Sequence, residues 1–253
     1  MNANSKIETR QRLDELLVAR GLFASRSRAR DAIERGTVKV DGTVAGKAGQ
    51  GVSADAAITV DDPAQAYVSR AALKLIAGLD HFGIDPSGRT ALDIGASTGG
   101  FTQVLLERGA AYVTAIDVGH GQMHPSLKTD KRVLCIEGLN ARELSAGDLG
   151  GHLPDLIVSD VSFISLKLAL PPALALAQIG AHGIFLVKPQ FEAGREAIGK
   201  GGLLKNPVDA PLIAEALKDW LDAVPGWRAL GVCPSPIEGS DGNREFLLAG
   251  VKA

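Results

Sequence analysis

Apolar and polar positions in the first sixty residues follow a pattern that predicts a small α+β unit. A helix over residues 10–20 would place its leucines on one face, and a second short helix, capped by Ser25 or Ser27, would end at Arg35. An alternating strand at 37–41 then enters a turn. The leucines of the first helix are Leu13, Leu16 and Leu17. We therefore predict a helical hairpin followed by a strand.

The rest of the chain alternates short apolar strands with helical stretches, after an acidic linker that contains a proline. A helix over 67–82 comes first, and another over 207–223 precedes two closing strands at 227–233 and 244–251. Such alternation is typical of a parallel sheet with crossover helices. The strands expected in the parallel part are 91–94, 112–116, 133–136, 156–159 and 184–187.

Length and composition are those of a globular protein with a sizeable core. With 253 residues and 45% hydrophobic content, we expect one medium domain and one small one. The longest apolar stretch, 167–188, is interrupted by prolines and glycines and predicts helix, turn and strand rather than a membrane span. Cys135 and Cys233 lack the spacing of metal ligands, so we expect no metal site. Because no charged-then-apolar leader precedes the first helix, we expect a cytoplasmic protein, and its oligomeric state is not indicated.

Basic residues gather in the predicted helical hairpin, although the whole chain is slightly acidic. The formal net charge of −2 gives no overall sign of nucleic-acid binding. A local basic face is nevertheless enough to contact a phosphate backbone. The arginines of the hairpin are Arg20, Arg26, Arg28, Arg30 and Arg35, against two acids. We interpret this stretch as an RNA-binding face.

The most informative segment is 91–102, in which a strand turns through small residues into a helix. Ligands of open α/β sheets bind outside the carboxyl end of such a strand, where small residues allow close approach. A dinucleotide fingerprint is broken, because Gly95 is followed by Ala96 and Ser97. The hydrolase nucleophile elbow G-x-S-x-G does match residues 95–99. Its position after the first strand of the large domain argues against a hydrolase, in which several strands precede the elbow.

A methyltransferase would use more of these residues. Asp93 ends the first strand, the following loop would lie under the amino-acid part of the cofactor, and Asp117 ends the next strand, where ribose hydroxyls need a carboxylate. A later segment, 194–200, spells G-x-x-x-x-G-K but continues with Gly201 where magnesium binding needs a hydroxyl. We interpret it as a flexible lid or substrate loop rather than an ATP site.

Four charged residues fall in or beside elements that are otherwise expected to be apolar. Ionised groups at such positions are costly unless they are paired. Any one of them alone is equally consistent with a strand end in water. The four are Lys74, Asp160, Lys188 and Glu245. Together they suggest a functional cluster.

Both parts of the chain resemble known families. The front end is similar to the RNA-binding domain named after ribosomal protein S4, whose pattern is R-L-D-x-x-L, a basic S-R-x-x-A helix, then V-x-V-D-G. Its matching residues are Arg12-Leu13-Asp14, Leu17, Ser27-Arg28, Ala32 and 38–42. The rest resembles the TlyA family of ribosomal RNA 2′-O-methyltransferases, often labelled haemolysins, with a large domain like that of FtsJ-type enzymes. Its matching segments are 67–75, 93–102, 117–122, 160–166, 187–192 and 242–246.

The resemblance implies an α/β fold: a class I (Rossmann-like) methyltransferase sheet, mostly parallel with an antiparallel last strand, plus a small α+β RNA-binding domain. It divides the chain into an RNA-binding domain (1–62), a linker (63–67) and a methyltransferase domain (68–253). It implies methyl transfer from S-adenosylmethionine to ribose 2′-hydroxyls of ribosomal RNA, with cytidines of the small- or large-subunit RNA as expected targets. The expected partners are ribosomal RNA or ribosomal subunits, without a membrane.

Roles for individual residues also follow from the resemblance. In a lysine-aspartate-lysine-glutamate tetrad, Lys188 is the candidate general base and Lys74 disfavours its protonation. Asp160 and Glu245 orient the two ammonium groups. Expected cofactor contacts are Asp93, Gly95, Ala96, Ser97, Thr98, Gly99, Gly100, Phe101, Asp117, Asn140 and Asp160. Expected RNA contacts are Arg12, Arg20, Arg26, Arg28, Arg30, Arg35, Lys39 and Arg70.

Two alternatives belong to other functional classes. A pore-forming haemolysin would need a leader, a membrane-length span or a strongly amphipathic exposed helix, and none is evident in the sequence. An RNA-binding protein with an inactive methyltransferase fold would not need the charged tetrad that this sequence retains. Cofactor binding would separate that second alternative from an active enzyme.

Overall fold

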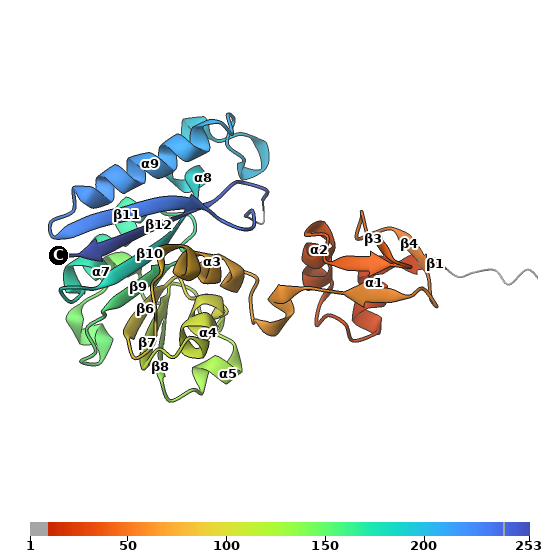
Figure 1. Ribbon diagram of the computed structural model, residues 1–253, viewed down its shortest axis with the longest axis horizontal. Coiled ribbons are helices and arrows are strands. Elements are labelled where there is room, and N and C mark those ends of the chain that lie inside the picture. Colours follow the sequence, from red (N-terminus) through yellow and green to blue (C-terminus); the bar gives the residue numbers. More distant parts are fainter. Residues whose placement is uncertain (1–9, 240) are drawn as a thin grey trace, which may run out of the picture. The chain divides into compact units, whose positions relative to one another are not determined.

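The computed structural model describes residues 10–239 and 241–253, which form two compact units that meet in sequence between Ala66 and Tyr67 (Figure 1). The first unit contains two small sheets, β1 with β4 and β3-β2-β5, and all their pairings are antiparallel. Its elements are β1 (Arg10–Arg12), α1 (Leu13–Ala19), α2 (Arg26–Glu34), β2 (Val38–Val40), β3 (Thr43–Val44), β4 (Gly51–Ser53), β5 (Ile58–Val60) and a short 3-10 helix, η1 (Pro63–Ala66).

The helical hairpin predicted for the first unit is present. Leu13, Leu16 and Leu17 of α1 are buried in one core with Ala29 and Ile33 of α2. Ser25 caps α2, because its hydroxyl accepts a hydrogen bond from a backbone N–H in the first turn. The prediction of a helix from residue 10 was wrong by three residues, since the chain enters α1 through β1, which pairs with β4. That pairing is set by a segment about forty residues away, which a local pattern does not contain.

The second unit contains a seven-stranded sheet in the order β11-β12-β10-β9-β6-β7-β8. The pairings β8-β7, β7-β6, β6-β9 and β9-β10 are parallel, while β12 is antiparallel to β10 and to β11. This confirms the predicted mostly parallel sheet with an antiparallel last strand. The strands are β6 (Thr90–Ile94), β7 (Tyr112–Asp117), β8 (Val133–Glu137), β9 (Leu156–Ser159), β10 (His182–Val187), β11 (Trp227–Pro234) and β12 (Phe246–Lys252).

Helices cover both faces of this sheet (Figure 1). Strand side chains alternate between two cores, so that Ala91 packs on one face with α3, α4 and α5, while Leu92 packs on the other with α6, α7 and α9. The helices are α3 (Ala72–Phe82), α4 (Gly100–Glu107), α5 (Pro125–Lys128), α6 (Leu166–Ala169), α7 (Pro171–Leu176), α8 (Pro189–Glu192) and α9 (Asp209–Asp222). Short 3-10 turns are η2 (Ala141–Glu143), η3 (Ala146–Leu149), η4 (Arg195–Ala197) and η5 (Lys200–Gly202).

Two helices begin later than the sequence pattern predicts. The helix expected from residue 67 starts at Ala72, and the N–H of Val68 before it donates to the side chain of Gln103. The last helix starts at Asp209 rather than at Pro207. The apolar stretch 167–188 does form helix, turn and strand. Within the residues that the structure describes, no helix is both long and apolar enough to cross a membrane.

The order of the strands creates a reversal point beside β6. From β6 the chain adds β7 and β8 on one side, then returns to place β9 on the other. The carboxyl ends of β6 and β9 therefore flank the crevice where open α/β sheets bind ligands. Gly95 follows β6 and Asp160 follows β9, so the two loops meet there.

Candidate active site

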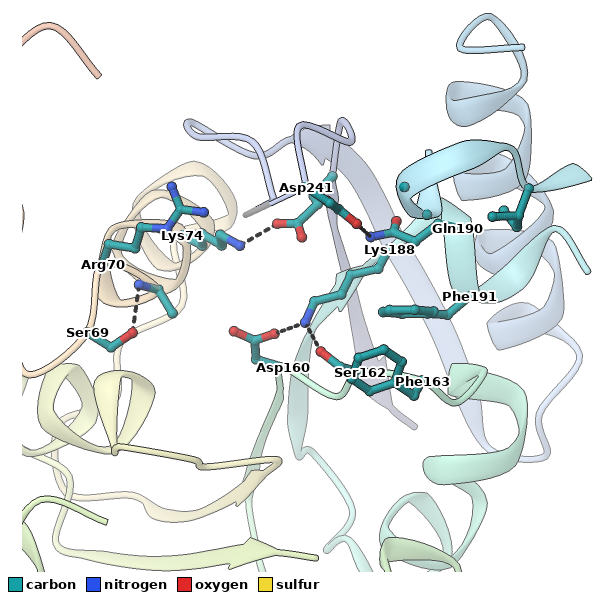
Figure 2. A pocket seen from close by; sticks show the side chains of 15 residues that line it. Ser69, Arg70, Lys74, Asp160, Ser162, Phe163, Lys188, Gln190, Phe191 and Asp241 are labelled. Carbon is teal, nitrogen blue, oxygen red and sulfur yellow. Dashed lines mark hydrogen bonds and ion pairs between the residues drawn. The ribbon is translucent and has the colours of Figure 1, made fainter. Parts of the chain in front are cut away.

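The four charged residues singled out in the sequence come together in the second unit. Lys74 lies in α3, Asp160 follows β9, Lys188 follows β10 and Glu245 precedes β12. They form two ion pairs, one between Lys74 and Glu245 and one in which Nζ of Lys188 lies 2.6 Å from Oδ1 of Asp160. Figure 2 shows the second pair and the neighbouring Lys74 projecting into one pocket.

Sheet topology explains why residues so distant in sequence converge. Because β9 and β10 are parallel neighbours, Asp160 and Lys188 leave the sheet at the same edge. Because β12 is antiparallel to β10, its first residue, Phe246, is the register partner of Val187, and Glu245 arrives at that edge as well. Lys74 reaches it from α3, which packs on the face of the sheet.

Burial makes pairing necessary for these charges. The residues Lys74 and Glu245 are only 5% and 4% exposed. Burial raises the pKa of the Glu245 carboxyl, and the charge of Lys74 opposes that rise. A lone charge in this position would be costly, so each ionic group stabilises its partner in the ionised form.

Two cavities meet at this cluster. The larger has a volume of about 570 Å³ and the smaller about 160 Å³. Residues that line both are Ser69, Ala71, Asp160, Ser162 and Lys188. The smaller cavity is also lined by the loop after β6, through Gly95, Ala96, Ser97, Thr98, Gly100 and Phe101. The larger one is also lined by Arg70, Lys74, Phe163, Phe191 and Glu245, among others. A group in one cavity can thus reach a group in the other across Asp160 and Lys188.

The loop between β6 and α4 has a backbone that only small residues accommodate. Gly95 and Gly99 have φ angles of +80° and +96°. A Cβ on Gly95 would lie 2.8 Å from the carbonyl oxygen of Asp160, and one on Gly99 would clash with Cδ1 of Leu127. The loop is therefore packed against the segment after β9 on one side and against α5 on the other. It leads into the N-terminus of α4, whose free N–H groups favour an anionic ligand.

Asp117 holds this loop from the end of β7. Its carboxylate accepts hydrogen bonds from the N–H of Ser97 at 2.8 Å and from the N–H of Gly119 at 2.7 Å. The hydroxyl of Ser97 donates to Oε1 of Gln122 at 3.0 Å. A hydrolase nucleophile at Ser97 would need a general base, and its hydrogen-bond partner here is an amide, so the geometry disfavours the nucleophile elbow.

Asp93 lies beneath the loop, fully buried in β6. Burial raises the pKa of its carboxyl to about 7, against the hydrogen bond that the Thr102 hydroxyl donates to Oδ2 at 2.6 Å. Its other oxygen, Oδ1, is buried without a hydrogen-bond partner among the described residues. A buried acceptor of this kind is either protonated or ready for a donor from a ligand.

Some predicted cofactor residues do not line either cavity: these are Asp93, Gly99, Asp117 and Asn140. Asp93 lies beneath the loop after β6, Gly99 is the last residue of that loop, and Asp117 accepts a hydrogen bond from the loop backbone. Asn140 instead caps η2, where its Oδ1 accepts a hydrogen bond from the N–H of Arg142 at 3.1 Å. The structure therefore brings together the tetrad and the loop but gives Asn140 a local structural contact.

The predicted RNA contacts fall into groups with different surroundings. Arg12, Arg26 and Arg30 surround the carboxylate of Asp14. The guanidinium of Arg35 is engaged by Asp31 and Asp62 and its side chain is only 13% exposed. Arg20 donates to the carbonyl oxygens of Ala54 and Ala56, and Arg28 to that of Ala64. Lys39 is exposed on β2, and Arg70 lines the larger cavity of the second unit.

Sequence reasoning assigned no role to two residues that the structure places in the site. Ser162 lines both cavities, and its Oγ accepts a hydrogen bond from Nζ of Lys188 at 2.7 Å (Figure 2). Phe163 is 91% exposed, has a φ angle of +65° and lies 5.1 Å, centroid to centroid, from Phe191. Both lie in a segment that the family pattern had marked, but neither contact is visible in a local pattern.

The loop predicted to act as a lid or substrate loop borders the larger cavity. Ile198 of that loop lines the cavity, and so do Gly201 and Gly202 directly after it. The buried side chain of Asn243 fixes the loop, because its amide donates to the carbonyl of Gly202 at 2.9 Å and its Oδ1 accepts from the N–H of Leu204 at 3.1 Å. Asn243 precedes Glu245 by two residues, so the residue that holds this loop lies next to a member of the tetrad in the sequence.

Comparison with known proteins agrees with this architecture. A model of the FtsJ-like methyltransferase family matches residues 67–252, and a model of the S4 domain matches residues 11–58. A Mycobacterium tuberculosis protein named 16S/23S rRNA (cytidine-2′-O)-methyltransferase TlyA is 45% identical over 240 residues, which are 94% of this chain and 89% of that one. A Campylobacter jejuni protein named 23S rRNA (cytidine-2′-O)-methyltransferase TlyA is 40% identical over 77% of this chain and 75% of its own length.

Solved structures show the same likeness. A Streptococcus thermophilus structure that bears the name hemolysin is 36% identical, with a TM-score of 0.74 over 97% of this chain and 90% of that chain. A family model that covers most of the chain, together with relatives of this identity over most of its length, settles the classification. This chain belongs to the family of FtsJ-like methyltransferases, in its TlyA group, and carries an S4 domain at its front.

Proposed function

We propose that this chain transfers a methyl group from S-adenosylmethionine to the ribose 2′-hydroxyl of a cytidine in ribosomal RNA. The observation that carries this proposal is the pairing of Lys188 with Asp160 at the point where two cavities meet. Two relatives whose names give cytidine-2′-O methylation of ribosomal RNA support the substrate class. Because the substrate is ribosomal RNA, we expect the enzyme to act in the cytoplasm.

The smaller cavity and its surroundings fit S-adenosylmethionine. The cofactor carries a carboxylate, which suits the N-terminus of α4, and an ammonium group and ribose hydroxyls, which suit acidic acceptors. Asp117 supplies a carboxylate at the end of β7, while the buried Asp93 supports the cofactor loop from beneath. When bound, S-adenosylmethionine supplies an electrophilic methyl group on a positively charged sulfur.

The larger cavity suits a nucleotide. Arg70 can contact a phosphate, and the exposed ring of Phe163 beside Phe191 offers an aromatic face to a base. Phe163 keeps a left-handed backbone conformation that is costly for a bulky residue, and such strain concentrates at functional sites. A base held there would place its ribose near Lys188, which lines the same cavity.

Lys188 is the residue that we propose removes the proton from the 2′-hydroxyl. To act as the base, Lys188 first releases to solvent the proton that it carries in the ion pair with Asp160. The neutral amine then has two N–H groups and one lone pair, and Nζ contacts two oxygens, Oδ1 of Asp160 and Oγ of Ser162. If these oxygens hold the two N–H groups, the lone pair faces the cavity that Lys188 lines, where it can accept the substrate proton. Lys74, held by Glu245, contributes a second positive charge that stabilises the developing oxyanion.

The experiment that tests the function is methyl transfer from isotope-labelled S-adenosylmethionine to purified ribosomal subunits. The modified nucleotide is located by reverse-transcription stops at low nucleotide concentration. We expect label in a cytidine ribose of one or both subunit RNAs. Label on a base, or no transfer despite cofactor binding, would contradict the proposal.

The assignment of Lys188 has a test of its own. Lys188→Ala is expected to reduce methyl transfer at least about a thousandfold, as loss of a general base with its charge typically does. Calorimetry should show cofactor binding within about threefold of the wild type, because the loop after β6 is unchanged. Lys167→Ala, which removes an exposed lysine of α6 outside both cavities, serves as the control. Substantial activity in Lys188→Ala would show that the base lies elsewhere.

A further inference from the structure

A single buried carboxylate in the first unit holds three arginines. Asp14 accepts hydrogen bonds from Nε and Nη2 of Arg12 at 3.0 and 3.2 Å, from Nε and Nη2 of Arg26 at 3.3 and 3.1 Å, and from Nε of Arg30 at 3.1 Å. The arginines come from two different elements, since Arg12 ends β1 while Arg26 and Arg30 belong to α2. Glu15 adds an outer contact, with its Oε1 at 3.0 Å from Nη1 of Arg26.

The carboxylate of this cluster is buried, whereas its three arginine side chains are about half exposed to solvent. The side chain of Asp14 is 0% exposed, whereas those of Arg12, Arg26 and Arg30 are 46%, 45% and 50% exposed. The hydrogen bond from Arg12, followed by those from Arg30 and Arg26, holds the pKa of the Asp14 carboxyl well below its usual range, against the effect of burial. A guanidinium carries five N–H donors in a rigid plane, and two or fewer of its nitrogens contact Asp14 in each case.

Backbone hydrogen bonds hold the residue that carries this carboxylate in place. The N–H of Asp14 donates to the carbonyl of Ala48 and the N–H of Leu13 to that of Gln50, both at 3.0 Å, so the start of α1 is tied to the segment before β4. The anchor is therefore rigid while the arginines keep an exposed side. Arg35 differs, because Asp31 and Asp62 engage its guanidinium and its side chain is largely buried.

We propose that Asp14 is a positioning residue that aligns Arg12, Arg26 and Arg30 into one preformed binding site for the phosphates of the RNA backbone. The inference rests on the RNA methyltransferase function proposed above and deepens it. A long side chain loses rotamer entropy when a ligand immobilises it, and Asp14 removes much of that loss before RNA arrives. The three positive charges still outnumber the two negative charges of Asp14 and Glu15, so the cluster is cationic.

Geometry and charge make opposite predictions for the removal of Asp14. If the arginines acted only as charges, loss of a carboxylate would strengthen RNA binding and steepen its salt dependence. If Asp14 positions them, its loss releases the three side chains and weakens binding although the net charge becomes more positive. Glu34 provides the matched control, because it lies exposed in α2 and its conversion to glutamine changes the net charge equally.

The test compares Asp14→Asn with Glu34→Gln in the full chain. Fluorescence anisotropy with a labelled ribosomal RNA stem-loop, over a range of salt concentrations, gives the affinity and its salt slope. We expect Asp14→Asn to bind at least about fivefold more weakly than wild type with a shallower salt slope, and Glu34→Gln to bind as tightly or more tightly. Equal or tighter binding by a folded Asp14→Asn would overturn the proposal.

A second pair keeps the inference testable if Asp14→Asn does not fold. Arg26→Lys keeps the charge of a half-exposed residue but cannot make the two-nitrogen contact with Asp14. Arg10→Lys is its control, an exposed arginine of β1. We expect a loss of at least about threefold in RNA affinity for Arg26→Lys and less than about twofold for Arg10→Lys. Equal affinities in this pair would count against the proposal.

Methyl transfer separates this inference from the proposed function. At saturating ribosomal subunits, Asp14→Asn should keep kcat while its KM for the subunits rises, because Asp14 acts on RNA binding and not on the reacting atoms. If the wild type transferred no methyl group, the proposed function would fail, yet the affinity comparison would still decide the role of Asp14. If transfer were normal and the affinity order reversed, only the role of Asp14 would fall.

Discussion

At the scale of single residues, the charged groups buried in the described part of the chain each meet another polar or charged group. Lys74 meets Glu245, Lys188 meets Asp160, and Asp14 meets three arginines. Such groups cost free energy to bury, so their positions are restricted and each removal has a defined consequence. Two residues at this scale, Ser162 and Asp93, lead to predictions that the tetrad alone would not suggest.

Ser162 is expected to orient Lys188. Ser162→Ala removes one of the two oxygens that contact Nζ, so the amine can rotate and its lone pair loses its direction. We expect kcat to fall about tenfold with KM values for cofactor and RNA within about twofold, and Ser162→Thr to restore most of kcat. Single-turnover methyl transfer measures the step directly, with Ser126→Ala as a control hydroxyl outside both cavities. Failure of threonine to restore activity would point to a merely structural role.

Asp93 should make stability depend on pH. Below about pH 4 its carboxyl is protonated in both folded and unfolded chains; as pH rises to about 7, only the unfolded chain ionises it, so the wild type loses stability. Above pH 7 both states are ionised and the penalty is constant. Asp93→Asn abolishes this effect, so the free energy of unfolding of the variant relative to wild type should rise by about 1.4 kcal/mol per pH unit between these values. Urea titrations at several pH values measure it, and a difference that does not change with pH would refute it.

At the scale of elements, the turn from β6 into α4 is the feature on which the ligand crevice depends. Its backbone is positioned by Asp117 from β7 and packs against the segment after β9. Three strand ends and one helix start therefore share a single small loop. We expect a change in that loop to affect all of them, because the loop contacts both the carbonyl of Asp160 and the carboxylate of Asp117.

Gly95→Ala is expected to weaken cofactor binding. Its new Cβ would lie 2.8 Å from the carbonyl oxygen of Asp160, and its φ angle of +80° is strained for alanine. We expect at least a tenfold loss of S-adenosylmethionine affinity by calorimetry. Gly88→Ala is the matched control, because Gly88 also has a positive φ angle, of +71°, but a Cβ there would meet nothing within 4 Å. If Gly95→Ala bound the cofactor as tightly as Gly88→Ala, the close packing of Gly95 against Asp160 would not be needed for cofactor binding.

At the scale of the whole molecule, the chain has two units with separate hydrophobic cores. The core of the first unit is built on α1 and α2, and the sheet of the second unit carries one core on each face. The S4 domain and the methyltransferase domain lie in different units. A substitution in the first unit can therefore alter RNA binding without altering methyl transfer. The comparison of kcat and KM for Asp14→Asn depends on this separation.

Calorimetric unfolding is expected to show two transitions. Each unit buries its own core, so each can unfold cooperatively by itself. Asp14→Asn should lower the Tm of one transition by several degrees, because it leaves three arginines without their shared partner, and should leave the other within about 1 °C. Asp93→Asn should move only the other transition. A single transition that both variants shift would contradict independent units.

The sequence by itself determined the class of fold and most of the helices and strands of the second unit, although not where each helix begins. The spacing of apolar residues in 91–94 and 156–159 depends on neighbours only a few positions away, and that local information is sufficient for strands and helices. The four tetrad residues were recognisable as unusual, because an ionised side chain among apolar neighbours stands out in a sequence.

Only the tertiary structure decided which partners these charges have. Glu245 meets Lys74 because β12 runs antiparallel to β10, and β1 forms because β4 lies beside it. The same holds for the hydrogen bond between Ser162 and Lys188, the ion pairs of Arg35 with two acids, and the hydrogen bond by which Asn140 caps η2. These contacts depend on distant segments or on backbone angles that no local pattern encodes. Local periodicity fixes most elements, whereas an edge strand such as β1 and the contacts between distant segments arise only when the folded chain brings those segments together.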